Sequence, residues 1–251
     1  MPTRLLDLST QIADLTRCPI SAASRDLTFL IANLSKIRHR VDTNDYLKQE
    51  DILAELEEFD ADLTHWAMHV SPSCNYDVVP TPHPLEISAN FKINPLKEYS
   101  HRYSGILLAN MWNQYRTAKL QTHDMILTQL RPRAMSSGPL AIEAHTYCSG
   151  IRQQMRILAD EICCSAPYIL GLLTHEKRDP STPGVKSSAG GFFLLWPLAM
   201  AALADQHPSS VCNFVFQCFD VIARAMGIHQ ALVFRETVIS QFDQYAWADH
   251  L

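Results

Sequence analysis

Apolar residues recur at the spacing of an α-helix through most of this chain, and this periodicity restricts the fold more than any other feature. It predicts helices over residues 5–17, 26–41, 48–70, 103–130, 139–165, 192–205, 208–226 and 232–251. The segment 103–130 is apolar on most of its circumference, which is typical of a helix at the centre of a domain. Because only 8 glycines occur, a β-rich fold with many tight turns is disfavoured. We therefore expect an all-α protein, an irregular multi-helix bundle.

Two proline- or glycine-containing segments interrupt this pattern. Residues 71–95 contain five prolines, which cannot lie inside a helix without cost, and we expect a long extended linker there. Residues 174–191 are polar and contain two prolines and three glycines, which predicts a surface loop. Pro132 and Pro167 are each expected to end the helix that precedes them. A length of 251 residues allows one or two domains, and we expect a single helical domain over 1–251.

Cysteine usage and charge exclude several classes of protein. The seven cysteines are odd in number and include no C-x-x-C pair, which favours buried free thiols in a reducing, intracellular compartment over a zinc ribbon. A net charge of −5 gives no general attraction for nucleic acid. The first 14 residues lack the apolar run of a secretory signal, and no run approaches 18 apolar residues, so we expect no membrane span.

Five short stretches carry a family pattern. They are residues 59–66, 112–119, 159–171, 191–198 and 225–232, which read FDADLTHW, WNQYRTAK, ADEICCSAPYILG, GFFLLWPL and AMGIHQAL. In the same order, they resemble the motifs LDA-x-L-x-x-W, WN-x-YR-x-AR, DDICASVPYLLG, GYFLLWPL and R-x-MGIRQAL. These motifs belong to the fungal-specific transcription factor domain, the regulatory region of fungal binuclear zinc-cluster transcription factors. The resemblance covers about residues 50–235.

The chain departs from that family at its DNA-binding module. Family members normally begin with six closely spaced cysteines that hold a binuclear zinc cluster, whereas here Cys18 and Cys74 are the only cysteines before Cys148. We therefore expect no direct nucleic-acid binding by this chain. The resemblance implies a nuclear regulatory or effector-binding module in secondary metabolism, acting through a protein partner or as a homodimer. A purely cytoplasmic location is the alternative.

Four residues are candidates for binding a small hydrophobic metabolite: Trp112, Tyr115, Arg116 and Trp196. Aromatic residues at helical spacing more often fill a core, and that interpretation is favoured. A buried Arg116 needs a carboxylate partner, for which Asp160 and Glu161 are candidates, and a structural ion pair is favoured over a ligand site.

The alternative function is a stand-alone enzyme derived from this scaffold, such as a cyclase or isomerase of a hydrophobic metabolite. Its candidate catalytic residues are His101, Arg116, His145 and Tyr147. Cys148 follows His145 by three residues, but a thiol in the core is expected to be inert. His65 and His69 are spaced i, i+4 without an evident third ligand, so we expect no metal site and no cofactor.

Overall fold

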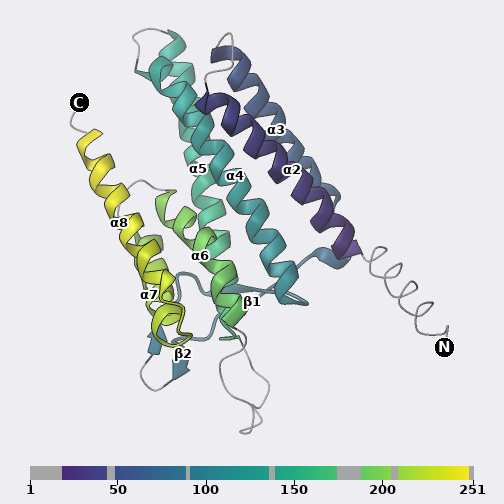
Figure 1. Cartoon of the computed structure of the whole chain (residues 1–251), viewed down its shortest axis with the longest axis vertical. Coiled ribbons are helices and arrows are strands. Elements are labelled where there is room, and N and C mark those ends of the chain that lie inside the picture. The colour runs from purple at the N-terminus through teal and green to yellow at the C-terminus, as the bar shows by residue number, and fades with distance from the viewer. Residues whose placement is uncertain are drawn as a thin grey trace, which may run out of the picture. The chain divides into compact units, whose positions relative to one another are not determined.

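The structure is a computed structural model, and it describes residues 19–43, 49–88, 91–135, 139–173, 188–204 and 209–248. Helices make up most of the described chain, which confirms the all-α prediction (Figure 1). The chain divides into two compact units, Met1–Asn75 and Tyr76–Leu251, and each is described by itself. The expected single domain stays a prediction.

The first unit contains a pair of amphipathic helices, α2 (Pro19–Asp42) and α3 (Gln49–His69), and the short 3₁₀ helix η1 (Pro72–Cys74). The sides of α2 and α3 that pack together bury residues at helical spacing: Leu27, Leu34, Ile37, Leu56, Phe59, Leu63 and Trp66. The indole nitrogen of Trp66 donates to the carbonyl of Ala23 at 3.1 Å, which joins the two helices. Both predicted helices are confirmed within a few residues, except that α2 begins earlier. The predicted helix over 5–17 lies outside the described residues.

The second unit is built around two long helices, α4 (Ile106–Ala134) and α5 (Pro139–Ile169), which lie side by side (Figure 1). α6 (Ser188–Leu203) packs on both of them. α7 (Ser210–Arg224) and α8 (Gln230–Ala248) pack on α6 and on each other. The core between these helices is apolar and includes Leu108, Leu120, Ile162 and Phe219. This arrangement confirms the prediction that the helix around 103–130 is central.

Three prolines lie inside helices of the described residues. Pro132 and Pro167 lie within the last turns of α4 and α5, so the prediction that they end those helices is wrong. A proline near a C-terminus removes one backbone hydrogen bond, and the burial of neighbours such as Ala166 and Ile169 offsets that cost. Pro197 lies in the middle of α6, because that helix begins at Ser188.

The early start of α6 corrects the predicted loop over 174–191 at its last four residues. Residues 174–187 lie outside the described part of the chain. Gly190 and Gly191 belong to α6, and both pack closely against neighbouring segments. A Cβ atom at Gly190 would come within 2.6 Å of the carbonyl oxygen of Ile169. These glycines therefore allow close helix packing, and they do not form a loop.

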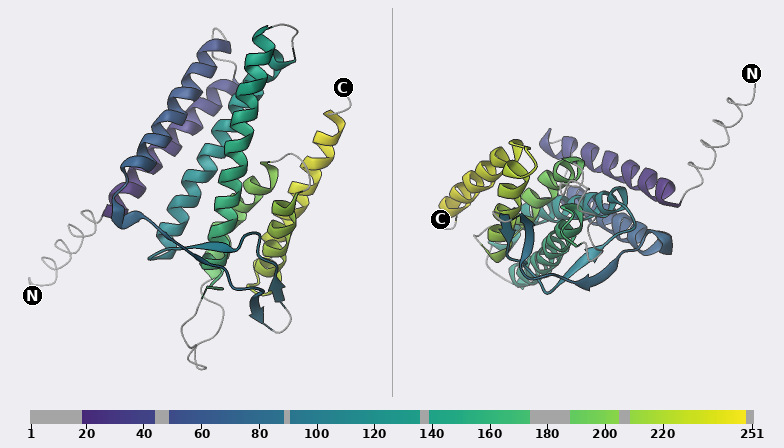
Figure 2. Two further views of the ribbon diagram at one scale, coloured as in Figure 1. Left: turned by 180° about the vertical axis from the view of Figure 1, so that it is seen from behind. Right: turned by 90° about the horizontal axis from the view of Figure 1, so that it is seen from below.

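The described residues of the linker predicted over 71–95 form the 3₁₀ helix η1 and short strands. β1 (Asp77–Pro80) pairs antiparallel with β4 (Tyr99–Arg102), and β2 (Leu85–Ser88) pairs with β3 (Phe91–Ile93). The strands lie across the end of the second unit at which α4 begins and α5 ends (Figure 2). The sequence did not predict this pairing, because strands of three or four residues are too short to show a clear strand periodicity.

The ends of α7 follow local rules of helix capping. Ser209 accepts a hydrogen bond from the backbone N–H of Cys212, which satisfies one free donor at the start of the helix. After the helix, Gly227 has φ +76°, and the N–H of Ile228 donates to the carbonyl of Ile222 at 3.1 Å. A glycine with positive φ just after a helix is typical of a helix C-terminus.

Six cysteines lie in the described residues, and all six are buried free thiols, as predicted: Cys74, Cys148, Cys163, Cys164, Cys212 and Cys218. Across the described ranges, no helix combines the length and the apolar character needed to cross a bilayer.

Candidate functional site

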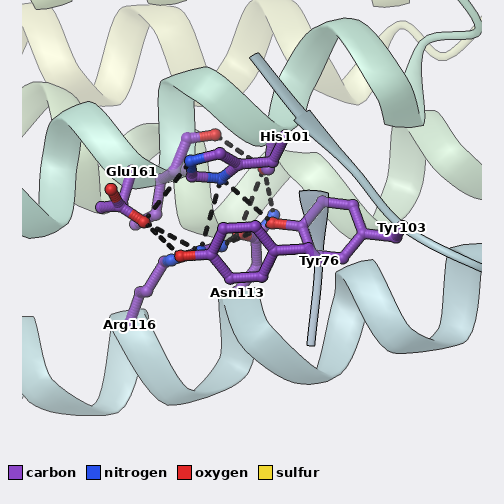
Figure 3. Close-up of polar contacts among 8 residues, drawn as sticks. Tyr76, His101, Tyr103, Asn113, Arg116 and Glu161 are labelled. Carbon is purple, nitrogen blue, oxygen red and sulfur yellow. Dashed lines mark hydrogen bonds and ion pairs between the residues drawn. The ribbon is translucent and has the colours of Figure 1, made fainter. Parts of the chain in front are cut away.

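The most polar part of the interior of the second unit is a group of seven residues from four segments (Figure 3). We call it the Arg116 cluster: Tyr76, His101, Tyr103, Asn113, Arg116, Glu161 and Ser165. Asn113 and Arg116 lie three residues apart on one side of α4, and Glu161 and Ser165 lie four apart on α5. The chain before β1 supplies Tyr76, and β4 and the residue after it supply His101 and Tyr103.

Arg116 lies at the centre of the cluster and is 2% exposed. Its Nη1 donates to the hydroxyl of Tyr103 at 2.9 Å and to Oδ1 of Asn113 at 3.0 Å. Its Nη2 lies 3.1 Å from Oε2 of Glu161. The guanidinium also lies over the ring of Tyr76, 5.1 Å from the centroid. A buried arginine needs such partners, and the predicted ion pair is found with Glu161.

Glu161 connects the cluster to the linker segment. Its Oε2 accepts a hydrogen bond from the hydroxyl of Tyr76 at 2.8 Å, in addition to the ion pair with Arg116. The Glu161 side chain is 28% exposed, so the cluster reaches the surface at this point. Asp160, the other candidate partner, pairs instead with Lys97 at 2.8 Å.

Asn113 joins α4 to α5 at the base of the cluster. Its Nδ2 donates to the hydroxyl of Ser165 at 2.8 Å, and that hydroxyl lies 2.7 Å from the carbonyl of Ile162, to which it can donate. Both side chains are fully buried. Since buried polar groups without partners are costly, this pairing fixes the register of the two helices.

His101 is neutral in this environment. Burial and the nearby Arg116 charge lower its pKa to about 4, against the opposing effect of Glu161. Its Nδ1 lies 3.3 Å from the hydroxyl of Tyr103 and 3.5 Å from Nη2 of Arg116. Because Arg116 only donates, Nδ1 must accept, and the ring proton therefore lies on Nε2, 3.6 Å from Oε2 of Glu161.

The two tyrosines of the cluster are protonated phenols. Burial is the main cause that raises the pKa of Tyr76 and of Tyr103, although the Arg116 charge acts in the opposite direction on both. The cluster therefore holds one ion pair and neutral hydrogen-bonding groups at neutral pH. The polar contacts of Arg116 and His101 described above are all with other residues of the cluster. The arrangement is therefore suited to holding α4, α5 and the segment from Tyr76 to Tyr103 together.

The structure separates the four predicted ligand-binding residues. Trp112 is buried beside Tyr76 and Tyr115, with ring centroids 5.5 and 5.8 Å away, and Tyr115 is half-buried. Together with Arg116 these residues lie on one stretch of α4. Trp196 is 48% exposed on α6, and its ring lies 6.4 Å from that of Phe234. The sequence motifs did not distinguish this surface tryptophan from a core residue.

The predicted catalytic residues are likewise divided. His101 and Arg116 belong to the Arg116 cluster, whereas His145 and Tyr147 are exposed on α5. His145 and Cys148 do lie on one pocket, between α4 and α5. Burial raises the pKa of the Cys148 thiol, so the thiol is not activated as a nucleophile.

His65 and His69 stack on each other, with ring centroids 4.0 Å apart. Nδ1 of His69 lies 2.8 Å from the carbonyl of His65, which occupies one possible ligand atom. No group of three or more His, Cys, Asp or Glu residues in the described ranges is placed to hold a metal ion.

Sequence reasoning missed Tyr76, Tyr103 and Ser165 as members of the cluster. Tyr103 was expected at the start of a helix, because its neighbours fit the helical period. The available signal was the buried position of Arg116, whose five N–H donors require several acceptors. That requirement predicts acceptors in contact but does not say which segments supply them.

Comparison of the chain with protein-family models, with curated proteins and with solved structures gave no match. The resemblance to the fungal transcription factor domain therefore stays a prediction.

Proposed function

We propose that this chain is a transcription-factor-like regulatory module that works by pairing with a second copy of itself. The observation that carries the proposal is the uncovered apolar side of α6. The resemblance to the fungal regulatory domain supports a nuclear role in the control of secondary metabolism.

We call this surface the α6 face, and it consists of Phe192, Trp196, Met200 and Leu203. These residues recur every three or four positions, so they lie on one side of the helix. Phe192 is 52% exposed and Trp196 is 48% exposed, while Met200 and Leu203 are half-buried. No residue from Ala189 to Leu203 is charged. Scattered exposed apolar residues are common on proteins, but a continuous uncharged stripe is typical of a protein interface.

A second copy of the chain is the partner that fits this face. Two copies can meet here without burying any charge, because neither face carries one. Most soluble homo-oligomers are symmetric pairs in which each copy presents the same patch. A standard interface covers about 800 Å² on each partner, which is more than one helix side offers. α8 packs beside α6 through the contact between Phe234 and Trp196, and the neighbouring Val233 is 61% exposed, so α8 borders the α6 face.

The Arg116 cluster supports regulation over the alternative, a cyclase or isomerase of a hydrophobic metabolite. A general base needs a free site near its substrate, whereas Nδ1 of His101 faces Arg116 and Tyr103. His145 and Tyr147 lie elsewhere, on the exposed side of α5. Mass spectrometry of a metabolite extract incubated with the protein separates the two functions. A metabolite that acts as an effector of a regulator is recovered with its mass unchanged, whereas a substrate of an enzyme is recovered as a product of different structure.

The pairing is tested by sedimentation velocity on the full chain at increasing concentration. We expect a species of twice the 28.3 kDa chain mass. The double variant Phe192→Ser/Trp196→Ser should raise the dimer dissociation constant by about a hundredfold or more, because exposed aromatics at an interface centre contribute most to binding. Leu107→Ser is the matched control, since Leu107 is 67% exposed on α4, outside the α6 face.

A wild-type chain that stays at 28.3 kDa at every concentration would overturn the pairing, as would a double variant that dimerises like Leu107→Ser. Circular dichroism melting of each variant shows whether the fold is retained. For the regulatory role, the full chain fused to an unrelated DNA-binding domain should change transcription of a reporter, and the double variant should not. An unchanged reporter alongside a normal dimer would refute the regulatory role alone.

A further inference from the structure

The pocket between the second half of α4 and the first half of α5 carries two arginine side chains and an apolar floor. Its volume is about 270 Å³. The residues around it are Asp124, Leu127, Thr128, Arg131, Ala134, Met135, His145, Cys148 and Arg152. We propose that this pocket binds a small carboxylic acid with an apolar body, with the carboxylate held between Arg131 and Arg152.

The charge of the pocket selects an anion. Arg131 and Arg152 outnumber the single carboxylate, Asp124, although the chain as a whole has a net charge of −5. Neither guanidinium forms a hydrogen bond or ion pair with another side chain in the described part of the protein, in contrast to Arg116 and Arg235. Two unpaired guanidinium groups at one cavity offer a planar set of donors that matches a carboxylate.

The floor of the pocket selects an apolar body. Leu127 and Cys148 are buried there, 9% and 4% exposed, and Ala134 and Met135 add apolar surface at one side. Burial raises the pKa of the Cys148 thiol, while the Arg152 charge acts to lower it, so the thiol is uncharged and lies near that guanidinium. The floor is therefore neutral directly beside the cationic rim, and an amphipathic acid can contact both.

The volume limits the size of the ligand. Pockets for drug-sized ligands usually have about 300–1,000 Å³, and this one lies just below that range. A single ring or a short branched chain with one carboxylate fits these limits. This site is separate from the α6 face, so either proposal can fail without the other.

The test is a titration of the full chain, labelled with ¹³C at the methionine methyl groups, with sodium benzoate. Met135 lines the pocket and is 73% exposed, and Met68, which is 75% exposed in the first unit, is the internal reference. Met135→Leu assigns the signal. We expect a saturable shift of the Met135 methyl group, caused by the benzoate ring, and no comparable shift at Met68.

The variants Arg131→Gln and Arg152→Gln should each weaken benzoate binding by at least about tenfold, since each removes a charge-assisted hydrogen bond. Arg224→Gln is the matched control, because Arg224 is an exposed arginine on α7, and it should bind as the wild type does. Benzyl alcohol tests the need for the carboxylate, and inorganic phosphate tests the need for the apolar body. Both should bind at least about tenfold more weakly than benzoate.

Three results would overturn the proposal. The first is a Met135 signal that does not saturate with benzoate. The second is an unchanged affinity in both arginine variants. The third is phosphate or benzyl alcohol that binds as tightly as benzoate, because the site would then not require both features. Dimerisation is measured in the same samples, so a loss of pairing is seen separately from a loss of ligand.

Discussion

A single buried arginine determines the chemistry of its neighbours at the residue scale. The Arg116 guanidinium keeps its charge in the core because Glu161, Tyr103 and Asn113 satisfy its donors. In turn, burial and this charge keep His101 neutral. Removing Arg116 would leave a partly buried carboxylate without its counter-charge, which is why we expect the cluster to be stable only as a complete set.

The stability of the protein should depend on pH through His101. Its pKa is about 4 in the folded chain, against 6.5 ordinarily, so the unfolded chain binds the extra proton between these values. The contribution of neutral His101 to the free energy of unfolding is complete above pH 6.5, and it is lost as the pH falls toward 4. Between pH 7 and pH 5, the free energy of unfolding should fall by about 2 kcal/mol more in the wild type than in His101→Phe. Urea titrations at both pH values measure this difference.

Parallel pH curves for the wild type and His101→Phe would contradict the assignment of a neutral, buried His101. The window from pH 7 to pH 5 is chosen because Asp and Glu titrate mostly below it. The variant also loses hydrogen bonds, so only the change with pH is compared and not the absolute stability.

Close packing decides the geometry at the scale of elements. α6 approaches α5 so closely that a Cβ atom at Gly190 would lie 2.6 Å from a backbone oxygen of Ile169 and 3.2 Å from Cδ1 of Ile106. A backbone atom cannot move aside as a flexible side chain can. The spacing between α5 and α6 therefore depends on the absence of a side chain at this position.

We expect Gly190→Ala to lower the free energy of unfolding by about 1–3 kcal/mol, the usual cost of overpacking. Gly150→Ala is the matched control, because Gly150 also lies in a helix, α5, and nothing lies within 4 Å of its added Cβ. That variant should be more stable than the wild type by about 0.5–1 kcal/mol, since alanine favours the helix. Urea unfolding of both proteins checks this, and equal effects of the two substitutions would contradict it.

The sequence predicted the long helices well because their apolar residues repeat over many turns, as in α3 and α4. It failed at the ends of α4 and α5, where packing holds a proline that local preference would place outside the helix. It also failed at Gly190 and Gly191, which have the composition of a loop but the position of a contact. For the partner of Arg116, the sequence predicted either Asp160 or Glu161, and Glu161 is the one found. The contact with Tyr103 depends on the path of the chain through the strands, which hydrophobic periodicity does not predict.

At the scale of the whole molecule, two features stand out, namely the division at Asn75–Tyr76 and the distribution of the thiols. Tyr76 is the first residue of the second unit, and its hydroxyl is held by Glu161. The described cysteines, by contrast, are spread over both units and are at most 4% exposed. Burial raises the pKa of the thiols of Cys163 and Cys218, and it raises that of Cys164 to about 12.

Six thiols should therefore become reactive only when the chain unfolds. Native protein and protein in guanidinium chloride are treated with a disulfide reagent that reports each thiolate released, and the difference should be at least six thiols per chain, because the reagent attacks exposed thiolates. Cys148→Ala should reduce that difference by one. A difference of five or fewer in the wild type would show that at least one of these thiols is accessible in the fold.

The pairing of β1 with β4 affects where insertions and deletions can occur in related chains. Asp77 pairs with Arg102 in this register, so the ladder closes the segment 77–102. Tyr76 and Tyr103, the two cluster residues, lie directly outside the two ends of this closed segment. Extra residues inserted between β2 and β3 would lie inside that closed segment and would not displace either tyrosine. Related chains could therefore gain or lose length between β2 and β3 over evolutionary time while both tyrosines keep their places.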